Sequence, residues 1–232
     1  MKLKNLLSAR LKKRYKRFLV DVVLADGTEL TAHCPNTGSM RGCLEPGNPV
    51  MLSRAGNPAR RYPFTLEMIQ VDGCWVGINT ARTNHLVREA IENGVITDFG
   101  MVDRIQPEIK VSAGSRLDFL LMSGTAKIYM EVKNCTLVEG RRAMFPDAIT
   151  SRGTKHLREL AELARGGHEA AIFFCVQRTD GEVFAPAAHI DPLYARTLAE
   201  VVAQGVKVLA YQAVVGPAEI RLTHALPVQL AE

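Results

Sequence analysis

The sequence predicts a two-domain protein of the α+β class, in which a small β-barrel precedes a mixed α/β sheet flanked by helices. Two observations carry this prediction. Residues 1–80 contain five short strand patterns separated by turn signals, whereas residues 81–232 follow the order α-β-β-β-α-β-α-β. The length of 232 residues leaves enough core for two such domains. We therefore expect domains at 1–80 and 81–232.

The first domain consists of short strands joined by tight turns. Asp-Gly pairs at positions 26–27 and 72–73 mark two hairpin turns. This number of short strands in so small a segment favours a barrel, and the OB-fold is the natural candidate. The strand patterns occupy residues 18–24, 29–33, 49–54, 62–71 and 74–78.

The second domain begins with an amphipathic helix. Residues 80–93 carry apolar side chains at helical spacing, and Gly94 supplies a C-terminal stop. The apolar run at residues 170–177 predicts a fully buried strand. Further helices are expected at residues 150–165 and 191–204, and further strands at residues 101–111, 116–122, 127–137 and 206–215.

Composition and cysteine usage limit the class of protein. Apolar residues make up 47% of the chain and charged residues 23%, as in ordinary globular proteins. No apolar run is long enough to cross a bilayer and no signal-peptide pattern follows the basic N-terminus, so we expect no membrane partner. The five cysteines are odd in number and scattered, which favours reduced thiols in the cytoplasm over disulfides or a zinc site.

Positive charge is concentrated in the first domain. Residues 1–64 contain twelve Lys and Arg against four Asp and Glu, a net charge of +8, whereas the remainder carries −3. This asymmetry is typical of a nucleic-acid-binding module joined to another domain, and a solvated basic tail is the alternative. The residues that we expect to contact DNA are Arg14, Lys16, Arg17, Arg60 and Arg61.

A second basic group opens the helix expected at residues 150–165. Arg152 and Lys155 lie there beside Gly153, where a phosphate backbone could approach closely. Helix N-termini favour anions, so we add Arg152 and Lys155 to the expected DNA contacts. A solvated helix start explains the same residues equally well.

Charged residues interrupt two apolar strand patterns of the second domain. Asp118 lies in Leu-Asp-Phe-Leu-Leu, and Glu131 and Lys133 lie in Met-Glu-Val-Lys. Burying such a charge costs on the order of several kcal/mol unless it is paired or binds a metal. Glu131 and Lys133 share one face of their strand because side chains alternate.

The turn between these two strands decides where Asp118 lies. If Ser123 and Gly124 are its central residues, Asp118 pairs with Tyr129 and lies on the same face as Glu131. Both carboxylates could then reach one divalent cation. An Asp–Lys–Glu ion-pair cluster at a sheet edge is the alternative.

This arrangement resembles the PD-(D/E)XK nuclease superfamily, with Asp118 on the second strand and Glu131-x-Lys133 on the third. Leu117 stands where the name of the superfamily has proline. The resemblance implies that Asp118, Glu131 and Lys133 are catalytic. It also implies that Mg²⁺ or Mn²⁺ is held by Asp118 and Glu131, with Glu89 on the preceding helix as a further carboxylate. Lys133 would stabilise negative charge or orient the attacking water.

Six stretches carry a wider resemblance. They are Phe-Leu-Val-Asp-Val at 18–22, Cys-Pro-Asn-Thr-Gly-Ser-Met at 34–40, Ser-Arg-Leu-Asp-Phe at 115–119, Glu-Val-Lys-Asn-Cys-Thr-Leu at 131–137, Phe-Pro-Asp-Ala at 145–148 and Arg-Gly-Thr-Lys-His-Leu at 152–157. Over essentially its whole length the chain resembles the sugar fermentation stimulation protein A family. That resemblance implies an OB-like domain, a nuclease-like domain, and DNA binding tied to the regulation of sugar-utilisation genes.

The function expected from these observations is that of a cytoplasmic DNA-binding protein that cuts phosphodiesters with a divalent metal. Its DNA contacts should be mostly to phosphates, independent of sequence and strongly dependent on salt. A non-catalytic transcriptional regulator of sugar-utilisation genes is the alternative, although we find no helix-turn-helix pattern. A protein-interaction module is a third hypothesis, and the oligomeric state is left open.

Overall fold

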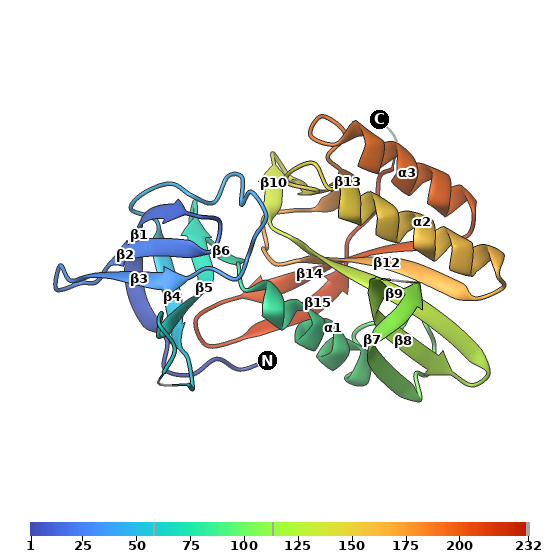
Figure 1. Ribbon diagram of the computed structural model, residues 1–232, viewed down its shortest axis with the longest axis horizontal. Helices are drawn as coiled ribbons and strands as arrows, with labels where there is room; N and C mark the ends of the chain where they lie inside the picture. Colours follow the sequence, from blue (N-terminus) through green and yellow to red (C-terminus); the bar gives the residue numbers. More distant parts are fainter. Residues whose placement is uncertain (58, 113, 231–232) are drawn as a thin grey trace.

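The computed structural model describes residues 1–57, 59–112 and 114–230, which form a β-barrel beside a larger sheet with helices on both faces (Figure 1). The barrel strands follow the order β3-β2-β1-β4-β5-β6, and a parallel pairing of His33 with Thr65 joins β3 to β5. The barrel is thereby closed, which confirms the predicted fold class. Its strands are β1 (Leu7–Tyr15), β2 (Leu19–Val23), β3 (Glu29–His33), β4 (Pro49–Arg54), β5 (Phe64–Val71) and β6 (Cys74–Gly77).

The basic run near the N-terminus is a barrel strand, which the sequence did not predict. In β1, Ala9 and Leu11 are buried, whereas Arg10 and Lys12 are exposed. β1 pairs with both β2 and β4. The strand alternation was hard to recognise because the outer face is almost entirely Lys and Arg. Much of the positive charge of this domain is therefore displayed on a strand rather than on a tail.

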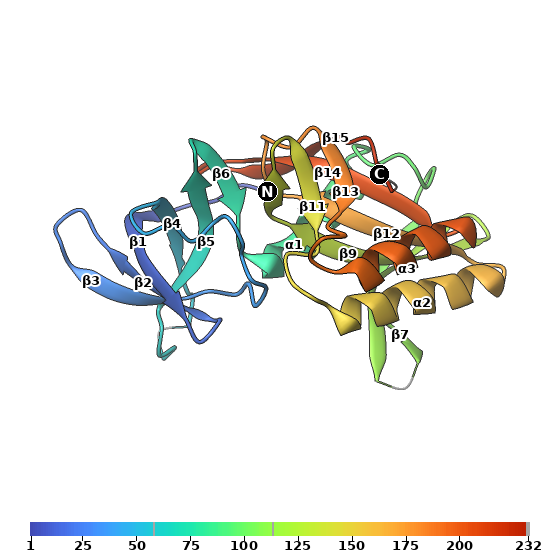
Figure 2. The same cartoon turned by 90° about the horizontal axis from the view of Figure 1, so that it is seen from above.

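The larger domain is built on a six-stranded mixed sheet in the order β15-β14-β12-β9-β8-β7. β12 is parallel to both of its neighbours and is buried over seven of its eight residues. Helix α1 covers one face, and α2 and α3 cover the other (Figures 1 and 2). These elements are α1 (Thr83–Glu92), β7 (Arg104–Ser112), β8 (Ser115–Ser123), β9 (Ala126–Cys135), α2 (Ser151–Arg165), β12 (Glu169–Val176), α3 (Pro192–Ala203), β14 (Lys207–Val215) and β15 (Ile220–Ala225).

The expected helices and main strands of this domain are present, with additions. The helix expected at residues 80–93 starts as a 3₁₀ turn, η1 (Thr80–Arg82), because Asn79 caps that turn by accepting the Ala81 N–H. The domain also contains a small second sheet that the sequence did not predict, because its three short strands carry too little alternation to be recognised. The edge strand β15 was missed as well. The small sheet consists of β10 (Leu137–Glu139), β11 (Arg142–Phe145) and β13 (Val183–Pro186).

The turn between β8 and β9 differs from the prediction. Ser123 pairs with Ala126, so Gly124 is the first central residue, with a φ of +56° that glycine adopts without steric cost. Leu120, and not Asp118, lies opposite Tyr129. The register is thus shifted by two residues, which keeps every side chain on its predicted face.

Specific contacts fix the two domains against each other. The N–H of Gly77 in β6 donates to the carbonyl of Gln177 at 2.8 Å. A Cβ at Gly77 would lie 2.2 Å from the Gln177 side-chain oxygen, so this approach requires glycine. At the same junction the buried Glu67 of β5 accepts two hydrogen bonds from Arg82 and one from Asn79. No helix in the described ranges is both long and apolar enough to span a membrane.

Candidate metal centre in the interdomain cleft

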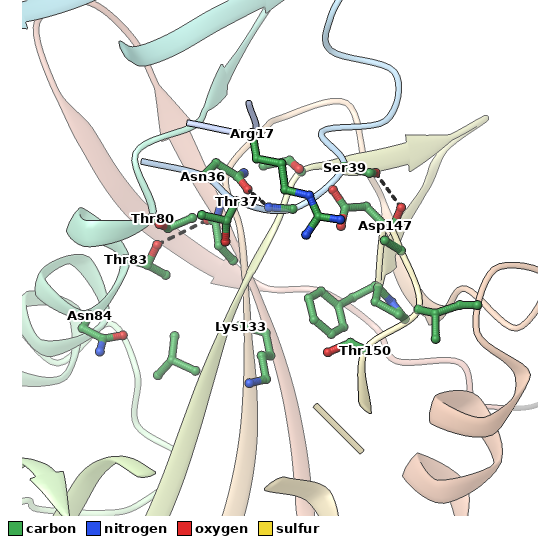
Figure 3. A pocket seen from close by; sticks show the side chains of 18 of the residues that line it. Arg17, Asn36, Thr37, Ser39, Thr80, Thr83, Asn84, Lys133, Asp147 and Thr150 are labelled. Carbon is green, nitrogen blue, oxygen red and sulfur yellow. Dashed lines mark hydrogen bonds between the residues drawn. The ribbon is translucent and has the colours of Figure 1, made fainter. Parts of the chain in front are cut away.

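A cleft of about 540 Å³ lies between the barrel and the larger domain, and residues of both domains line it. Its floor holds Asp118 of β8 and Lys133 of β9. Figure 3 shows Lys133 between Asn84 of α1 and Thr150 before α2, with Arg17 of the barrel across the cleft. The charged strand residues therefore open into a cavity that both domains share.

Asp118 is held by one partner on α1 and one on β9. Asn84 Nδ2 donates to Asp118 Oδ1 at 2.8 Å, and the Val132 N–H donates to Oδ2 at 2.8 Å. Burial first, and then the charge of Glu131, raise the pKa of the Asp118 carboxyl above its ordinary value despite these hydrogen bonds. The charge of Lys133 acts in the opposite direction but does not cancel these two effects.

Glu131 is in contact with two nitrogen atoms. Its Oε1 meets Lys133 Nζ and also Nδ1 of the buried His156 on α2. The two nitrogens lie 3.5 Å from each other. Burial opposes ionisation of Glu131, but the His156 hydrogen bond and the Lys133 charge outweigh it and lower the pKa of the Glu131 carboxyl. Asp118, whose ionisation is opposed, lines the cleft, whereas Glu131, whose ionisation is favoured, is buried and does not line it.

The barrel side of the cleft is a loop that Arg14 holds in shape. The Arg14 guanidinium donates to the carbonyls of Arg17, Asn36, Gly38 and Ser39 at 2.7–3.2 Å. Each carbonyl would otherwise lack a strand partner, so Arg14 fixes the loop that follows β3. This contact gives Arg14 a structural role at the cleft.

Asp147 joins the same loop to the larger domain. Its carboxylate accepts the Met40 N–H at 2.7 Å, and its carbonyl accepts the Ser39 hydroxyl at 2.6 Å (Figure 3). A Cβ at Gly38 would lie 3.1 Å from both carboxylate oxygens, which makes glycine the best fit there. The two walls of the cleft therefore touch, and these contacts fix its width on that side.

Three residues that build this site were not predicted as site residues. Asp147 and His156 lie within stretches that carried the family resemblance, so a signal for them existed. Asn84 lies on the polar side of α1, and no local pattern indicates that it reaches Asp118.

Glu89 does not lie at the cleft, contrary to expectation. Its carboxylate pairs with the N-terminal ammonium of Met1 at 2.7 Å, and the side chain is 45% exposed. Asn84, five residues earlier, is the α1 residue that reaches Asp118, and five residues turn a helix by about 140° beyond a full turn. The apolar stripe of α1 identified the face that packs on the sheet, but not which flank of that face reaches the carboxylates.

The basic residues expected to contact DNA divide into two groups. Arg14 and Arg17 line the cleft. The others do not line it: Arg60 donates to Thr65 Oγ1 at 3.1 Å, and Lys155 pairs with Glu159 at 3.6 Å. The residues outside the cleft are Lys16, Arg60, Arg61, Arg152 and Lys155, all of them exposed.

Asp118 at the cleft and the buried Glu131 are of the chemical type that a hard divalent cation requires, and they would supply only part of its ligand shell. Asp118 and Glu131 offer carboxylate oxygens, the ligands that Mg²⁺ and Mn²⁺ prefer. In the described parts of the chain, no three His, Cys, Asp or Glu side chains gather into a group that could hold a metal. Mg²⁺ commonly takes one or two protein carboxylates and completes its shell with waters and substrate phosphates. Asp118 and Glu131 would supply such carboxylates, with Oε1 of Glu131 already in contact with Lys133 and His156.

Family profiles cover both domains. The profile of the SfsA N-terminal OB domain matches residues 13–78, and that of the sugar fermentation stimulation protein RE domain matches residues 81–219. These matches confirm the resemblance found in the sequence.

Individual relatives match over nearly the whole chain. The sugar fermentation stimulation protein homolog of Pelobacter propionicus is 54% identical over 99% of this chain and 100% of its own length. That of Desulfotalea psychrophila is 55% identical over 97% of this chain and 93% of its own length. The solved structure of Pyrococcus furiosus SfsA in complex with Ca²⁺ is 27% identical, covers 99% of this chain and 98% of that chain, and superposes with a TM-score of 0.91.

Proposed function

Because the chain belongs to the sugar fermentation stimulation protein family and has Asp118 and Lys133 in an interdomain cleft next to the buried Glu131, we propose that it is a DNA-binding phosphodiesterase dependent on a divalent metal. The metal is Mg²⁺ or Mn²⁺. Asp118 and Glu131 hold it, and Lys133 acts beside them on the reacting phosphate.

The observation that carries this proposal is the state of Asp118. Burial and the neighbouring Glu131 charge raise the pKa of its carboxyl, so ionisation of Asp118 is opposed. The Lys133 charge acts in the opposite direction, but Lys133 also contacts Glu131, so one cation serves two carboxylates. A divalent cation between Asp118 and Glu131 removes this repulsion, and such a site polarises a phosphodiester and activates a water for attack. The Ca²⁺ complex of the Pyrococcus furiosus protein supports a divalent cation in the family.

The remaining side chains of the floor have roles that follow from their contacts. Lys133 Nζ faces the cleft beside Glu131, where its positive charge stabilises negative charge developing on the phosphate. His156 and Asn84 touch Glu131 and Asp118, respectively, and orient these carboxylates. They are positioning residues in this proposal.

DNA binding is supported by the charge of the barrel domain. The net charge of +8 over residues 1–64 and the basic outer face of β1 attract phosphates, mostly without regard to sequence. Affinity should therefore fall steeply as salt rises. All five cysteines are free thiols, which supports the expectation of a reducing, cytoplasmic location.

The test is a cleavage assay with purified full-length protein on labelled single- and double-stranded DNA. Reactions contain Mg²⁺, Mn²⁺ or EDTA, and the wild type is compared with Asp118→Ala and Lys133→Ala. We expect cleavage with either metal and none with EDTA. Each substitution should reduce the rate by about a hundredfold or more, because it removes a group that acts on the transition state.

Two outcomes contradict the proposal. Cleavage that persists in both variants comes from a contaminant or another site. Tight DNA binding that is insensitive to EDTA, with no cleavage by the wild type under any metal, favours the non-catalytic regulator instead.

A further inference from the structure

We propose that the DNA which enters the cleft is single-stranded, and that an unpaired base stacks on Phe18, the exposed residue that follows the cleft residue Arg17 in sequence. This inference rests on the proposed function, because it names the form of DNA that the same site takes. It is carried by the size of the cleft, by the contact between its walls, and by a strained turn that displays Arg17 and Phe18.

The size of the cleft fits a nucleotide rather than a double helix. Its volume of about 540 Å³ lies within the range of about 300–1,000 Å³ that encloses one small molecule. Asp118 and Lys133 lie at its floor, so a phosphate must descend into the cleft to reach them. In a duplex, each phosphate is followed by its sugar and by a base that is paired with the second strand. An unpaired strand can descend without bringing that second strand against the walls.

The walls are held together rather than left open. Asp147 accepts hydrogen bonds from Met40 and Ser39 of the barrel loop, which joins the two domains across one side of the cleft. Widening the cleft for a duplex would break both contacts. Much of the lining is neutral and polar: Asn36, Thr37, Thr80, Thr83 and Thr150 offer amide and hydroxyl groups. Such groups bind phosphate and sugar of either form, so the selection comes from the wall contacts that a duplex would have to break.

The turn between β1 and β2 is strained in a way that favours a functional role. Tyr15 pairs with Leu19, and the loop between them has Lys16 at a φ of +49° and Arg17 at a φ of +62°. Non-glycine residues avoid this left-handed region, and two consecutive ones without Gly or Asn are costly. Strained backbone of this kind clusters at ligand sites, and a type I′ hairpin turn also requires a positive φ at both central residues. Here it displays Arg17, which lines the cleft, and the adjacent Phe18.

Two exposed apolar side chains belong to the two walls or to their sequence neighbours. Phe18, which follows the cleft residue Arg17 in sequence, is 45% exposed, and Ile149, which lines the cleft, is 81% exposed. A base in a duplex is already stacked and paired, whereas an unpaired base gains from stacking on an aromatic ring. OB-fold domains bind single strands in this way, with basic residues along the backbone. Arg17 supplies a basic group for the backbone, and its sequence neighbour Phe18 supplies an aromatic ring for a base.

The experiment compares two forms of one DNA sequence by fluorescence anisotropy, with EDTA present to prevent metal-dependent cleavage. The probes are an oligonucleotide of about 16 nucleotides, the upper site size of one OB-fold, and a hairpin that carries the same sequence as a duplex. We expect the single strand to bind at least about tenfold more tightly. Phe18→Ala should weaken single-strand binding by about fivefold to a hundredfold and leave hairpin binding unchanged.

Two further variants separate binding from folding. Arg17→Gly should also weaken single-strand binding, while its melting temperature stays equal to the wild type or rises, because glycine relieves the left-handed strain. Met101→Ala is the matched control, since Met101 is 81% exposed and does not line the cleft; its affinities should equal those of the wild type.

The outcomes distinguish this inference from the proposed function. Equal or tighter binding of the hairpin overturns the inference and leaves the proposed nuclease intact. Unchanged single-strand affinity in Phe18→Ala overturns the stacking role. If neither form of DNA binds at low salt, the proposed function fails as well.

Discussion

Two regions of the molecule bury a carboxylate within an apolar strand, and the two carboxylates have opposite surroundings. Glu67 in β5 is 1% exposed and accepts hydrogen bonds from Arg82, Ser53 and Asn79. Burial opposes its ionisation, but these partners outweigh burial and lower the pKa of the Glu67 carboxyl. For Asp118 in β8, burial and the charge of Glu131 prevail and raise the pKa of the carboxyl.

The difference shows how a structural charge is distinguished from a candidate functional one. A charged residue inside an apolar strand indicates only that something compensates it. At Glu67 the compensating cation is Arg82, 29% exposed, which ties the barrel to the start of α1. At Asp118 the protein supplies hydrogen bonds and the charge of Lys133, but it also places a second carboxylate nearby, and Lys133 contacts that carboxylate as well. The substitutions that follow should therefore affect stability in one region and metal binding in the other.

The largest expected effect is on stability, at Glu67. Glu67→Ala leaves Arg82 without its partner at the domain junction, and breaking such a pair costs about 3–5 kcal/mol of the free energy of unfolding. The measurement is urea denaturation followed by circular dichroism. Glu29→Ala is the control, since Glu29 pairs with Lys12 at the surface and should lose less than about 1 kcal/mol. Equal losses in both variants would contradict this account of Glu67.

The pH dependence of that effect has a definite sign. Because the folded-state pKa of Glu67 is lowered, its contribution to stability is present above the unfolded carboxyl pKa of about 4.3 and is lost as pH falls through the folded value. The stabilities of the wild type and Glu67→Gln should therefore differ at neutral pH and converge in acid. A difference that stays constant down to low pH would show that packing, and not charge, explains the loss.

The next effect is on metal binding, at Asp118. Mg²⁺ or Mn²⁺ at a hundredfold excess over its dissociation constant should stabilise the wild type by about 2.7 kcal/mol, which raises the melting temperature by about 5–10 °C. Asp118→Asn should lose this shift, because it removes one of the two carboxylates. Glu67→Ala should melt at a lower temperature and yet keep the metal-dependent shift. Differential scanning calorimetry with and without EDTA measures all three, and a full shift in Asp118→Asn would contradict the assignment.

A smaller effect is expected at His156, which contacts Glu131 without facing the cleft as a ligand. Removing a residue that orients a metal-binding carboxylate commonly costs 10–100-fold in metal affinity, and we expect about that loss for Mn²⁺ in His156→Gln. Isothermal titration calorimetry is the measurement. Arg158→Gln, on an exposed position of the same helix, is the control. An affinity that rises in His156→Gln would mean that His156 competes with the metal for Glu131.

Local patterns predicted most of the fold, and the errors have physical causes. Helices α1 and α2 followed from apolar spacing, α3 was also predicted, and β12 followed from its uninterrupted apolar run. β1 was missed because only Ala9 and Leu11 of its nine residues are fully buried. The turn after β8 was placed one position too early, since Ser-Gly and Gly-Thr are both acceptable centres. The error left the faces intact only because the register shifted by an even number of residues.

The site was predictable where it depends on one strand pair and unpredictable where it depends on tertiary contacts. Asp118, Glu131 and Lys133 lie on neighbouring strands, and alternation placed them on one face. The contact of Ser39 with Asp147 joins residues 108 positions apart, and no local periodicity reports such an approach. The same limit explains Glu89 and Asn84, because the helix pattern identified the buried stripe of α1 but not which flank meets β8.

The smallest expected effect is at Glu89, and it tests which flank of α1 faces the metal site. Glu89→Gln removes a carboxylate that the sequence proposed as a third metal ligand and that the structure pairs with the Met1 ammonium. Because that pair is half exposed, its loss should cost less than about 1 kcal/mol of stability. The metal-dependent rise in melting temperature should be the same as in the wild type, whereas Asn84→Ala should reduce it by freeing Asp118. If the melting temperature of Glu89→Gln no longer rises with Mg²⁺ or Mn²⁺, the metal ligands lie on the other flank of α1. Asp118 would then not be a metal ligand, and its contrast with the structural Glu67 would fail.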